Sequence, residues 1–282
     1  MKTDLQKKQR KLSLNSVRLI VQLLFFIVAP APFAIAYAGI KGLFIKIGAG
    51  EAVALSAMLQ LSIAMIIFTF LFGRFFCGWA CAFGTYTDII NRIAKKLRIR
   101  QIQNKLINRF LPKLKYIIAA AVLLLCFFGQ SGRLSGKSVW DVFAKITAGN
   151  FYLSGYLIGV IVFLFVTAGS VFIERFFCRF FCPMGAVFAL SARLTPTRLK
   201  KKQPSCGKCG ICTSACPAGI NLYEMDAVRT GECLSCMKCT KSCPRDNVGI
   251  YFFGKKLPVY VIIIIQIICL AALLFWFRAV RI

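Results

Sequence analysis

Eight cysteines in the C-terminal third of the chain fall into two runs with the same spacing. The first run is Cys206, Cys209, Cys212 and Cys216, and the second is Cys233, Cys236, Cys239 and Cys243. Gaps of two, two and three residues separate the cysteines of each run, and a proline follows the fourth one. Cysteine thiolates at this spacing ligate cubane [4Fe–4S] clusters, with one thiolate for each iron. The spacing predicts two such clusters, whose chemistry is one-electron transfer.

We expect the two runs to exchange their fourth ligand. A tight loop with two-residue gaps can aim three thiolates at one cluster but cannot turn sharply enough to aim the fourth. The predicted sets are Cys206, Cys209, Cys212 and Cys243 for one cluster, and Cys233, Cys236, Cys239 and Cys216 for the other. A zinc ribbon would need two separated ligand pairs, and disulfide frameworks are typical of small secreted domains. The pattern resembles the bacterial two-cluster ferredoxin fold over residues 203–250.

Four more cysteines form two Cys-x₃-Cys pairs. They are Cys77 with Cys81, and Cys178 with Cys182. A gap of three residues puts both members of a pair on one face if the segment is helical. The four thiolates could hold a further iron–sulfur centre or another metal. The alternatives are redox-active dithiols and small side chains packed at a crowded helix end. Cys126 and Cys269 each lie alone in an apolar stretch and are expected to be core residues.

The composition indicates a membrane protein. Of the 282 residues 59% are hydrophobic, and the mean hydropathy is +0.73. These values predict several membrane spans. The net charge of +28 falls in blocks between apolar runs, which the positive-inside rule explains better than nucleic-acid binding does. The chain has no histidine, which excludes histidine-ligated haem and Rieske centres and leaves a carboxylate, tyrosine or water as the proton acceptor in any quinol site.

Five apolar stretches are predicted to span the bilayer. They are residues 19–38, 52–72, 116–131, 151–173 and 257–277, and all but the short third have about the 20 residues that a bilayer demands. Pro30 and Pro32 are expected to kink the first. Segments 1–18, 74–115 and 175–256 hold 6, 10 and 14 of the 37 lysines and arginines. This distribution predicts a multi-pass protein of the cytoplasmic (inner) membrane, with the N-terminus and the ferredoxin-like segment in the cytoplasm and the C-terminus outside.

The chain also contains an internal repeat. The motif Arg74-Phe-Phe-Cys77 recurs as Arg175-Phe-Phe-Cys178, and the loop around Lys46 recurs around Lys145. The similar offsets predict two tandem helix pairs, related as parallel repeats about an axis along the membrane normal. That symmetry should bring the two Cys-x₃-Cys ends together beneath the ferredoxin-like segment.

The predicted fold class is a polytopic α-helical membrane protein with an inserted two-cluster ferredoxin-like segment. The predicted parts are a basic cytoplasmic N-terminus (1–18), a first helix-pair repeat (19–100), a second repeat with a basic linker (101–202), the ferredoxin-like domain (203–250) and a C-terminal transmembrane helix (251–282).

Taken together, these features resemble the NapH family. Its members are membrane quinol dehydrogenase components of periplasmic nitrate reductase systems, with relatives among nitrous-oxide reductase regulators and oxidase-assembly iron–sulfur proteins. Cys77-Gly-Trp-Ala-Cys81 and Cys178-Arg-Phe-Phe-Cys182-Pro183 look like the paired motifs of the family. Ala82 stands where the first motif usually has proline, and the fifth span is additional to a four-span pattern. The resemblance implies electron transfer and leaves nitrate reduction open.

The resulting functional hypothesis is a relay of electrons between the quinone pool and a redox partner protein. No nucleotide or flavin motif is evident, so the chain is expected to be a subunit of a quinol-linked oxidoreductase system rather than a self-contained enzyme. Five basic residues of the ferredoxin-like segment favour a partner with an acidic docking face: Lys208, Arg229, Lys238, Lys241 and Arg245. The alternatives are an assembly or metal-handling factor for a respiratory complex, in which the paired cysteines handle the cargo, and a membrane redox sensor.

Overall fold

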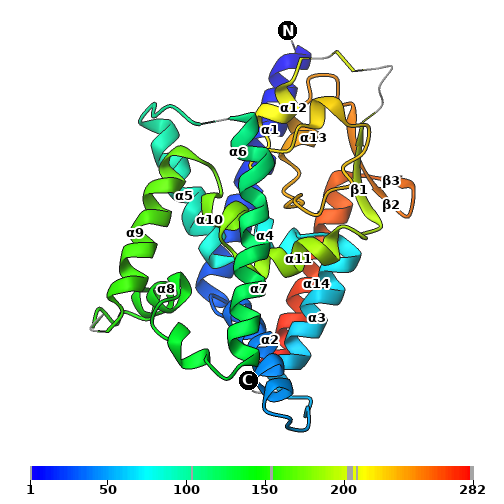
Figure 1. Cartoon of the computed structure of the whole chain (residues 1–282). Coiled ribbons are helices and arrows are strands. Elements are labelled where there is room, and N and C mark those ends of the chain that lie inside the picture. The colour runs from blue at the N-terminus through cyan, green and yellow to red at the C-terminus, as the bar shows by residue number, and fades with distance from the viewer. Residues whose placement is uncertain (1, 103, 153–154, 202–205, 208, 280–282) are drawn as a thin grey trace. The chain divides into compact units, whose positions relative to one another are not determined.

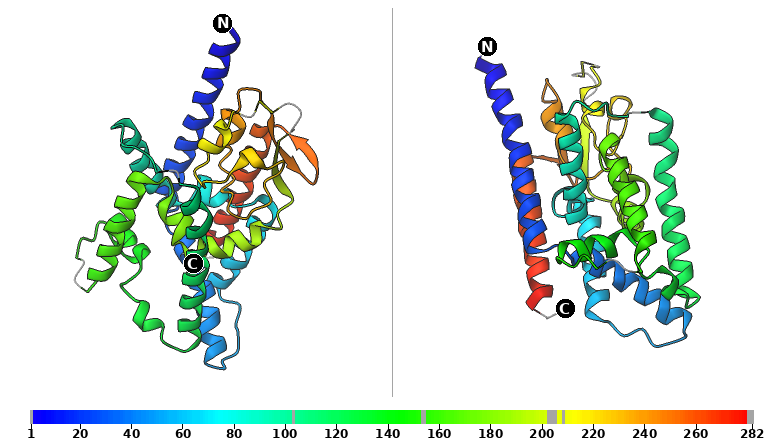
Figure 2. Two further views of the ribbon diagram at one scale, coloured as in Figure 1. Left: turned by 45° about the horizontal axis from the view of Figure 1, so that its top comes forward. Right: turned by 90° about the vertical axis from the view of Figure 1, so that its left-hand side faces the viewer.

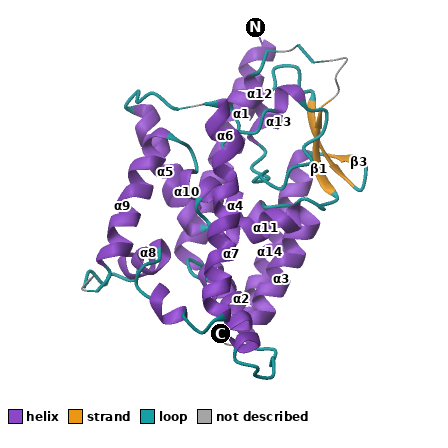
Figure 3. Ribbon diagram, viewed as in Figure 1, coloured by secondary structure: helices purple, strands orange, loops and turns teal. Residues whose placement is uncertain are grey.

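The computed structural model describes residues 2–102, 104–152, 155–201, 206–207 and 209–279, most of which are helical (Figure 1, Figure 3). The chain divides into two compact units. Unit 1 consists of Met1–Val28, Ile66–Cys81 and Phe188–Trp276. Unit 2 consists of Ala29–Met65, Ala82–Val187 and Phe277–Ile282.

Unit 1 contains both runs of four cysteines. Its elements are α1 (Lys2–Val28), the end of α3 (Ala57–Phe72), α4 (Phe75–Trp79), the end of α11 (Pro183–Ala192), β1 (Thr197–Lys201), α12 (Ile211–Ser214), η4 (Leu222–Glu224), α13 (Lys238–Ser242), β2 (Val248–Phe252), β3 (Lys255–Leu257) and α14 (Val259–Ala279). The short helix α13 contacts α1, α12 and β2, and α4 also contacts α1. The cysteine runs are therefore held among short helices and loops rather than on long ones.

An antiparallel sheet joins the two ends of the ferredoxin-like segment. Its strand order is β1-β2-β3, and Thr197 pairs with Phe252 while Lys201 pairs with Val248. Because β1 precedes the cysteine runs and β2 follows them, the pairing brings both ends of the segment together. Part of the predicted basic linker is thus a paired strand, and burial alternates along it with the two-residue period of a β-strand. The β2–β3 hairpin is the orange arrow in the left view of Figure 2.

Unit 2 is a helical bundle. Its elements are the start of α3, α2 (Pro32–Gly48), α5 (Ala82–Lys96), α6 (Lys105–Phe110), η1 (Leu111–Lys113), α7 (Leu114–Phe127), η2 (Ser131–Leu134), α8 (Val139–Thr147), α9 (Leu157–Phe172), α10 (Phe176–Phe180) and the start of α11. Helix α9 packs against α5 and α8, and α2 packs against α7. The short helix α10 contacts α5, α7 and α9, so the second Cys-x₃-Cys motif begins in the interior of this bundle (Figure 1).

Within the described residues, two helical segments are long and apolar enough to cross a membrane, Leu106–Phe127 and Val259–Phe277. A third is added if Leu14–Val28 and Pro32–Gly48 form one broken span. The break between these two helices contains Pro30, whose missing N–H cannot continue a helix. The predicted kink is therefore a full interruption of the helix. The predicted third span begins earlier than expected, at Leu106, and ends at Phe127.

The predicted second and fourth spans correspond to shorter helices. Helices α3 and α9 have 16 residues each and are apolar, which is less than the roughly 20 residues needed to cross a bilayer. The count of five spans stays a prediction, because the described helices supply two spans, or three with the broken pair, by length and composition.

Two pairs of helices in the predicted repeats agree in length, whereas α2 is longer than α8 and α5 is longer than α11. Helices α3 and α9 have the same length, as do α4 and α10. Both α2 and α8 end before a glycine in the left-handed region, Gly50 at φ +69° and Gly149 at φ +73°. Helices commonly end with a glycine in this left-handed conformation. The symmetric arrangement of the repeats about an axis stays a prediction.

A buried ion pair lies inside unit 2. The guanidinium of Arg175 donates from Nε and Nη2 to the two carboxylate oxygens of Asp88, each at 2.7 Å. The side chains are 0% and 3% exposed, so water does not compensate either charge. Arg175 lies three residues before Cys178, the first cysteine of the second Cys-x₃-Cys motif. The ion pair therefore links the start of this motif to α5, which carries Asp88.

We expect Asp88→Ala to destabilise the protein strongly. Removing one partner of a buried pair costs about 3–5 kcal/mol, because it leaves a desolvated charge. The melting temperature of the detergent-purified protein should therefore fall clearly. Lys95→Ala is the matched control, since Lys95 bonds Glu174 at 2.6 Å but is 46% exposed, and exposed pairs contribute about 0–1 kcal/mol. Equal effects of the two substitutions would contradict the prediction.

Candidate iron–sulfur sites

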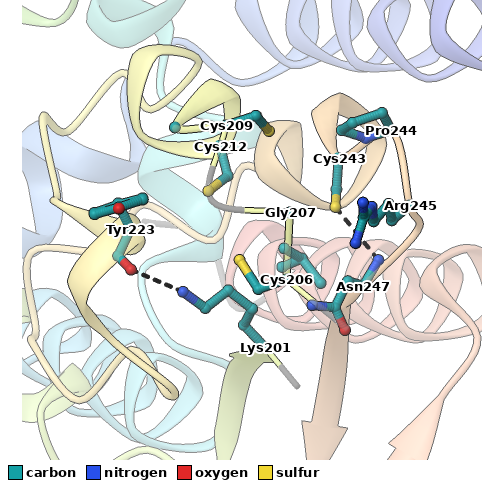
Figure 4. A pocket seen from close by; sticks show the side chains of 12 residues that line it. Lys201, Cys206, Gly207, Cys209, Cys212, Tyr223, Cys243, Pro244, Arg245 and Asn247 are labelled. Atoms are coloured by element: carbon teal, nitrogen blue, oxygen red, sulfur yellow. Dashed lines mark hydrogen bonds between the residues drawn. The ribbon is translucent and has the colours of Figure 1, made fainter. Parts of the chain in front are cut away.

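Four of the predicted thiols surround one cavity of about 180 Å³. Cys206, Cys209, Cys212 and Cys243 all line it. Cys206 and Cys209 lie in the loop before α12, Cys212 lies within α12, and Cys243 follows α13 directly. Because α12 packs on α13, the last cysteine of the second run is brought to the first run. Figure 4 shows the labelled thiols around the same space.

Two further groups shape this first cavity. Lys201 is buried at the end of β1, and its ammonium donates to the carbonyl oxygens of Leu222 and Tyr223 at 3.3 and 2.9 Å. The backbone N–H of Asn247 donates to the Cys243 sulfur at 3.4 Å (Figure 4). Burial raises the pKa of the Cys212 thiol, while a hydrogen bond with Thr213 and the Lys201 charge lower it. The cavity therefore combines four thiols with a fixed positive charge.

The other four predicted thiols line a second cavity. They are Cys216, Cys233, Cys236 and Cys239, surrounded by apolar side chains. Its volume is about 20 Å³, which is room for one or two water molecules, so its walls must move outward to enclose a larger group. Burial raises the pKa of the Cys239 thiol well above its usual value, and the neighbouring thiols of Cys236, Cys233 and Cys216 raise it further.

The donor sets of both cavities fit [4Fe–4S] clusters. Each cavity offers four thiols, and a cubane takes one thiolate for each of its four irons. Among the described residues, no group of three or more His, Cys, Asp or Glu side chains is arranged around a single ion position. A cubane keeps its ligands on four different irons, so it does not need such a position. Binding of iron by these thiols would release their protons, so it would depend on pH.

The first Cys-x₃-Cys motif packs directly on the loop of the second cavity. The indole N–H of Trp79 donates to the carbonyl oxygen of Ser235 at 3.1 Å, and a Cβ at Gly78 would overlap the carbonyl oxygen of Leu234. Arg74 contributes an ion pair with Glu232 at 3.5 Å. All of these residues belong to unit 1. The glycine of Cys77-Gly-Trp-Ala-Cys81 thus permits a close backbone contact beside Cys233 and Cys236.

Neither Cys-x₃-Cys pair lies on one continuous helix, in contrast to the helical spacing considered above. Cys77 is inside α4 and Cys178 is inside α10, whereas Cys81 and Cys182 lie at the breaks before α5 and α11. All four side chains are buried. The Cys182 sulfur accepts a hydrogen bond from the backbone N–H of Gly185 at 3.0 Å. Cys77 and Cys81 belong to unit 1 and Cys178 and Cys182 to unit 2, so a shared centre stays a prediction.

Sequence reasoning missed the groups that support the thiols. Lys201 stands in a basic run of the chain, and nothing in that run distinguishes it from Lys200. The pairing of β1 with β2 decides which of them is buried, because neighbouring residues of a strand face opposite sides. Cys126 is fully buried, as expected for a core residue, whereas Cys269 is exposed on α14, so the prediction that it lies in the core is wrong.

Comparison with known proteins relates two segments of the chain to a [4Fe–4S]-binding family. The family described as "4Fe-4S binding domain" matches residues 54–100 and 157–202, which contain the two Cys-x₃-Cys motifs. No solved structure gives a significant match.

The chain is similar to several curated proteins. The uncharacterized protein MJ0750 of Methanocaldococcus jannaschii is 28% identical over 85% of this chain and 97% of its own length. Protein NirI of Paracoccus denitrificans is 32% identical over 58% of this chain but only 24% of its own length. The ferredoxin-type protein NapH of Haemophilus influenzae is 25% identical over 64% of this chain and 63% of its own length. The chain is thus similar to ferredoxin-type proteins such as NapH, and part of it matches a 4Fe-4S binding domain.

Proposed function

We propose that the chain relays electrons between the quinone pool and a redox partner protein through two [4Fe–4S] clusters. The observation that carries the proposal is the crossed grouping of the thiols, with Cys243 beside the first run and Cys216 beside the second. A bound [4Fe–4S] cluster supplies reversible one-electron transfer. The names of relatives, among them a ferredoxin-type protein, support the same class of function.

The chain gives the two cavities different surroundings. Cys236 and Cys239 of the second cavity are buried, and α4 packs on the loop that carries Cys236. Cys209 of the first cavity is exposed. Solvent exposure and hydrogen bonds to the sulfurs set cluster potentials, so the two sites should differ in potential. We assign the first cavity to exchange with a soluble partner and the second to exchange with the Cys77 motif.

The rim of the first cavity suits a partner with an acidic face. Arg245 lines this cavity and is exposed, and its guanidinium lies beside Gly207. Arg229 is also exposed, while Lys238 and Lys241 are partly exposed. Lys208 lies outside the described residues. Complementary charges of this kind speed the encounter between proteins, and the effect weakens as the salt concentration rises.

The membrane half of the proposal rests on the apolar helices. The segments Leu106–Phe127 and Val259–Phe277 can anchor the chain in the bilayer, in which quinones dissolve. The charge distribution supports a cytoplasmic position for the cysteine runs in this proposal. We further propose that Cys77, Cys81, Cys178 and Cys182 pass electrons between the bilayer and the second cavity, as a further iron–sulfur centre or as redox dithiols.

Reduction by a quinol tests the function. The anaerobically purified protein is mixed with menaquinol, and the clusters are followed by low-temperature EPR, with dithionite as the reference reductant. We expect menaquinol to produce a substantial fraction of the dithionite signal within a catalytic timescale. Signals with dithionite but none with menaquinol would contradict quinol oxidation, and the assembly or metal-handling function would then take its place.

A further inference from the structure

Two buried hydrogen-bond donors of unit 2 lack partners. The hydroxyl of Tyr37 on α2 and the indole Nε1 of Trp140 on α8 are both shielded from solvent and make no hydrogen bond. The side chains are only 4% and 9% exposed. An unpaired buried donor costs free energy, so native proteins rarely keep one without a reason.

The rings that carry the two donors lie next to each other. The rings of Tyr37 and Trp140 meet edge to face, with centroids 5.3 Å apart. Pro32 starts α2, which places Phe33 and Tyr37 one turn apart on the same side. The Ser138 hydroxyl accepts the Trp140 backbone N–H at 3.2 Å and fixes the first turn of α8. Both donors are therefore positioned by helix starts that the sequence encodes locally.

The surroundings of the pair are aromatic and adjoin the second Cys-x₃-Cys motif. Trp140 also contacts Phe33 and Phe177, with ring centroids 4.7 and 5.6 Å away. Phe177 directly precedes Cys178 in the chain. The Tyr37 hydroxyl lies within electrostatic range of Cys182. A ligand bound by the two donors would thus lie beside the cysteines of this motif.

The chemistry of the pair selects a carbonyl oxygen. An indole N–H can only donate, and a tyrosine hydroxyl can donate at the same time. A water molecule could accept both hydrogen bonds, but its own hydrogens would then need acceptors, which phenylalanine rings supply poorly. A carbonyl oxygen has two lone pairs and no hydrogen. A flat ring attached to it would also pack well against the aromatic side chains.

We propose that Tyr37 and Trp140 bind a carbonyl oxygen of a quinone headgroup. This inference rests on the proposed quinone-linked function and names the residues of its site. It also supplies a tyrosine, one of the groups that a chain without histidine has left for a quinol site. The ester carbonyl of a phospholipid offers the same acceptor chemistry, and the experiment separates the two sources.

Titration with the quinol analogue 2-heptyl-4-hydroxyquinoline N-oxide tests the site through quenching of the analogue's fluorescence. The full chain in detergent is compared with Tyr37→Phe and Trp140→Phe, which keep a ring but remove the donor. We expect the dissociation constant to rise about tenfold in each variant, the equivalent of one hydrogen bond. Tyr86→Phe is the control, because the Tyr86 hydroxyl already bonds the Thr167 hydroxyl at 3.0 Å. It should bind the analogue like the wild type.

A melting experiment tests whether the Tyr37 hydroxyl has a purely structural role. Removal of an unpartnered hydroxyl should leave the melting temperature of ligand-free Tyr37→Phe unchanged or higher. A lower melting temperature with unchanged analogue binding would overturn the proposal. Menadione should displace the analogue from the wild type, whereas phosphatidylethanolamine at the same concentration should not. Displacement by the phospholipid would assign the site to lipid.

The outcomes also separate this site from the proposed function. If menaquinol reduces the clusters equally well in the wild type and both variants, and analogue binding is unchanged, quinol oxidation stands and the site is wrong. If the analogue binds in a Tyr37-dependent way but menaquinol reduces nothing, the site stands and electron transfer from quinol fails. If the wild type binds no analogue, the site is wrong.

Discussion

Replacement of Cys243 by alanine should remove the cluster of the first cysteine run, although Cys243 belongs to the second run. Cys243 lines the cavity of Cys206, Cys209 and Cys212, and Cys216 lines the other one. Each single substitution should lower the iron content by roughly four atoms per chain, the content of one cubane. Iron and acid-labile sulfide are measured after anaerobic purification.

Double substitutions make this prediction sharper. Cys206→Ala with Cys243→Ala should lose no more iron than either change alone, because both cysteines belong to one site. Cys233→Ala with Cys243→Ala should lose both clusters, since the two residues belong to different sites. Ligation by each run separately predicts the opposite results. Effects on one site are non-additive and effects on independent sites add, which is the logic of a double-mutant cycle.

Two controls accompany the cysteine series. Cys126→Ala and Cys269→Ala remove lone cysteines that line neither cavity, and both should keep the full iron content. Cysteine-to-serine variants repeat the series with a side chain of similar size. Loss of all iron from every single variant would show that the two sites do not form independently, and the assignment of separate cavities would fail.

Replacement of Cys77 by alanine should abolish reduction by quinol while reduction by dithionite continues. The helix that carries Cys77 abuts the second cavity through the Trp79–Ser235 hydrogen bond and the close approach at Gly78. If electrons reach the second cavity through Cys77, replacing Cys77 lowers the rate of cluster reduction by quinol and leaves the rate with dithionite unchanged. Replacing a residue that hydrogen-bonds a metal ligand typically lowers metal affinity or activity about 10–100-fold. Replacing Cys77 itself should therefore lower the quinol-dependent rate of cluster reduction at least about a hundredfold.

The measurement compares the rates of cluster reduction by menaquinol and by dithionite in the same preparation. Cys269→Ala is the matched control and should behave like the wild type with both reductants. An unchanged menaquinol rate in Cys77→Ala, together with poorer maturation of a respiratory complex in cells, would favour the assembly or metal-handling function. A fall of both rates would show that Cys77 supports the second cavity structurally instead.

Much of the candidate site follows from local spacing. The two-residue gaps within each run keep three thiols close together in the chain, and these three thiols line one cavity in the structure. The position of Cys243 at the first cavity and of Cys216 at the second agrees with the expected exchange, because a tight loop cannot aim its fourth thiol at the same point, and ligation by these thiols stays a prediction. The C-terminal apolar run ended within two residues of the predicted bounds, as expected for a long run with uniform composition.

Other features depended on where the helices end. The predicted second and fourth spans were longer than α3 and α9, because apolar composition continues past the point where the backbone stops being helical. The Cys-x₃-Cys motifs fit a helical period in the sequence, yet the backbone breaks at Cys81 and Cys182. Hydrophobic patterns indicate burial more reliably than they indicate the ends of an element.

The sequence by itself determined the chemistry of this protein, through its cysteine spacing, its lack of histidine and its apolar runs. Only the tertiary structure decided how α4 meets the second cavity and how Tyr37 meets Trp140. Trp79 and Ser235 are 156 residues apart in the chain, and no periodicity links positions so distant. Such contacts arise when whole elements pack, because the fit of many side chains selects one arrangement that no single segment encodes.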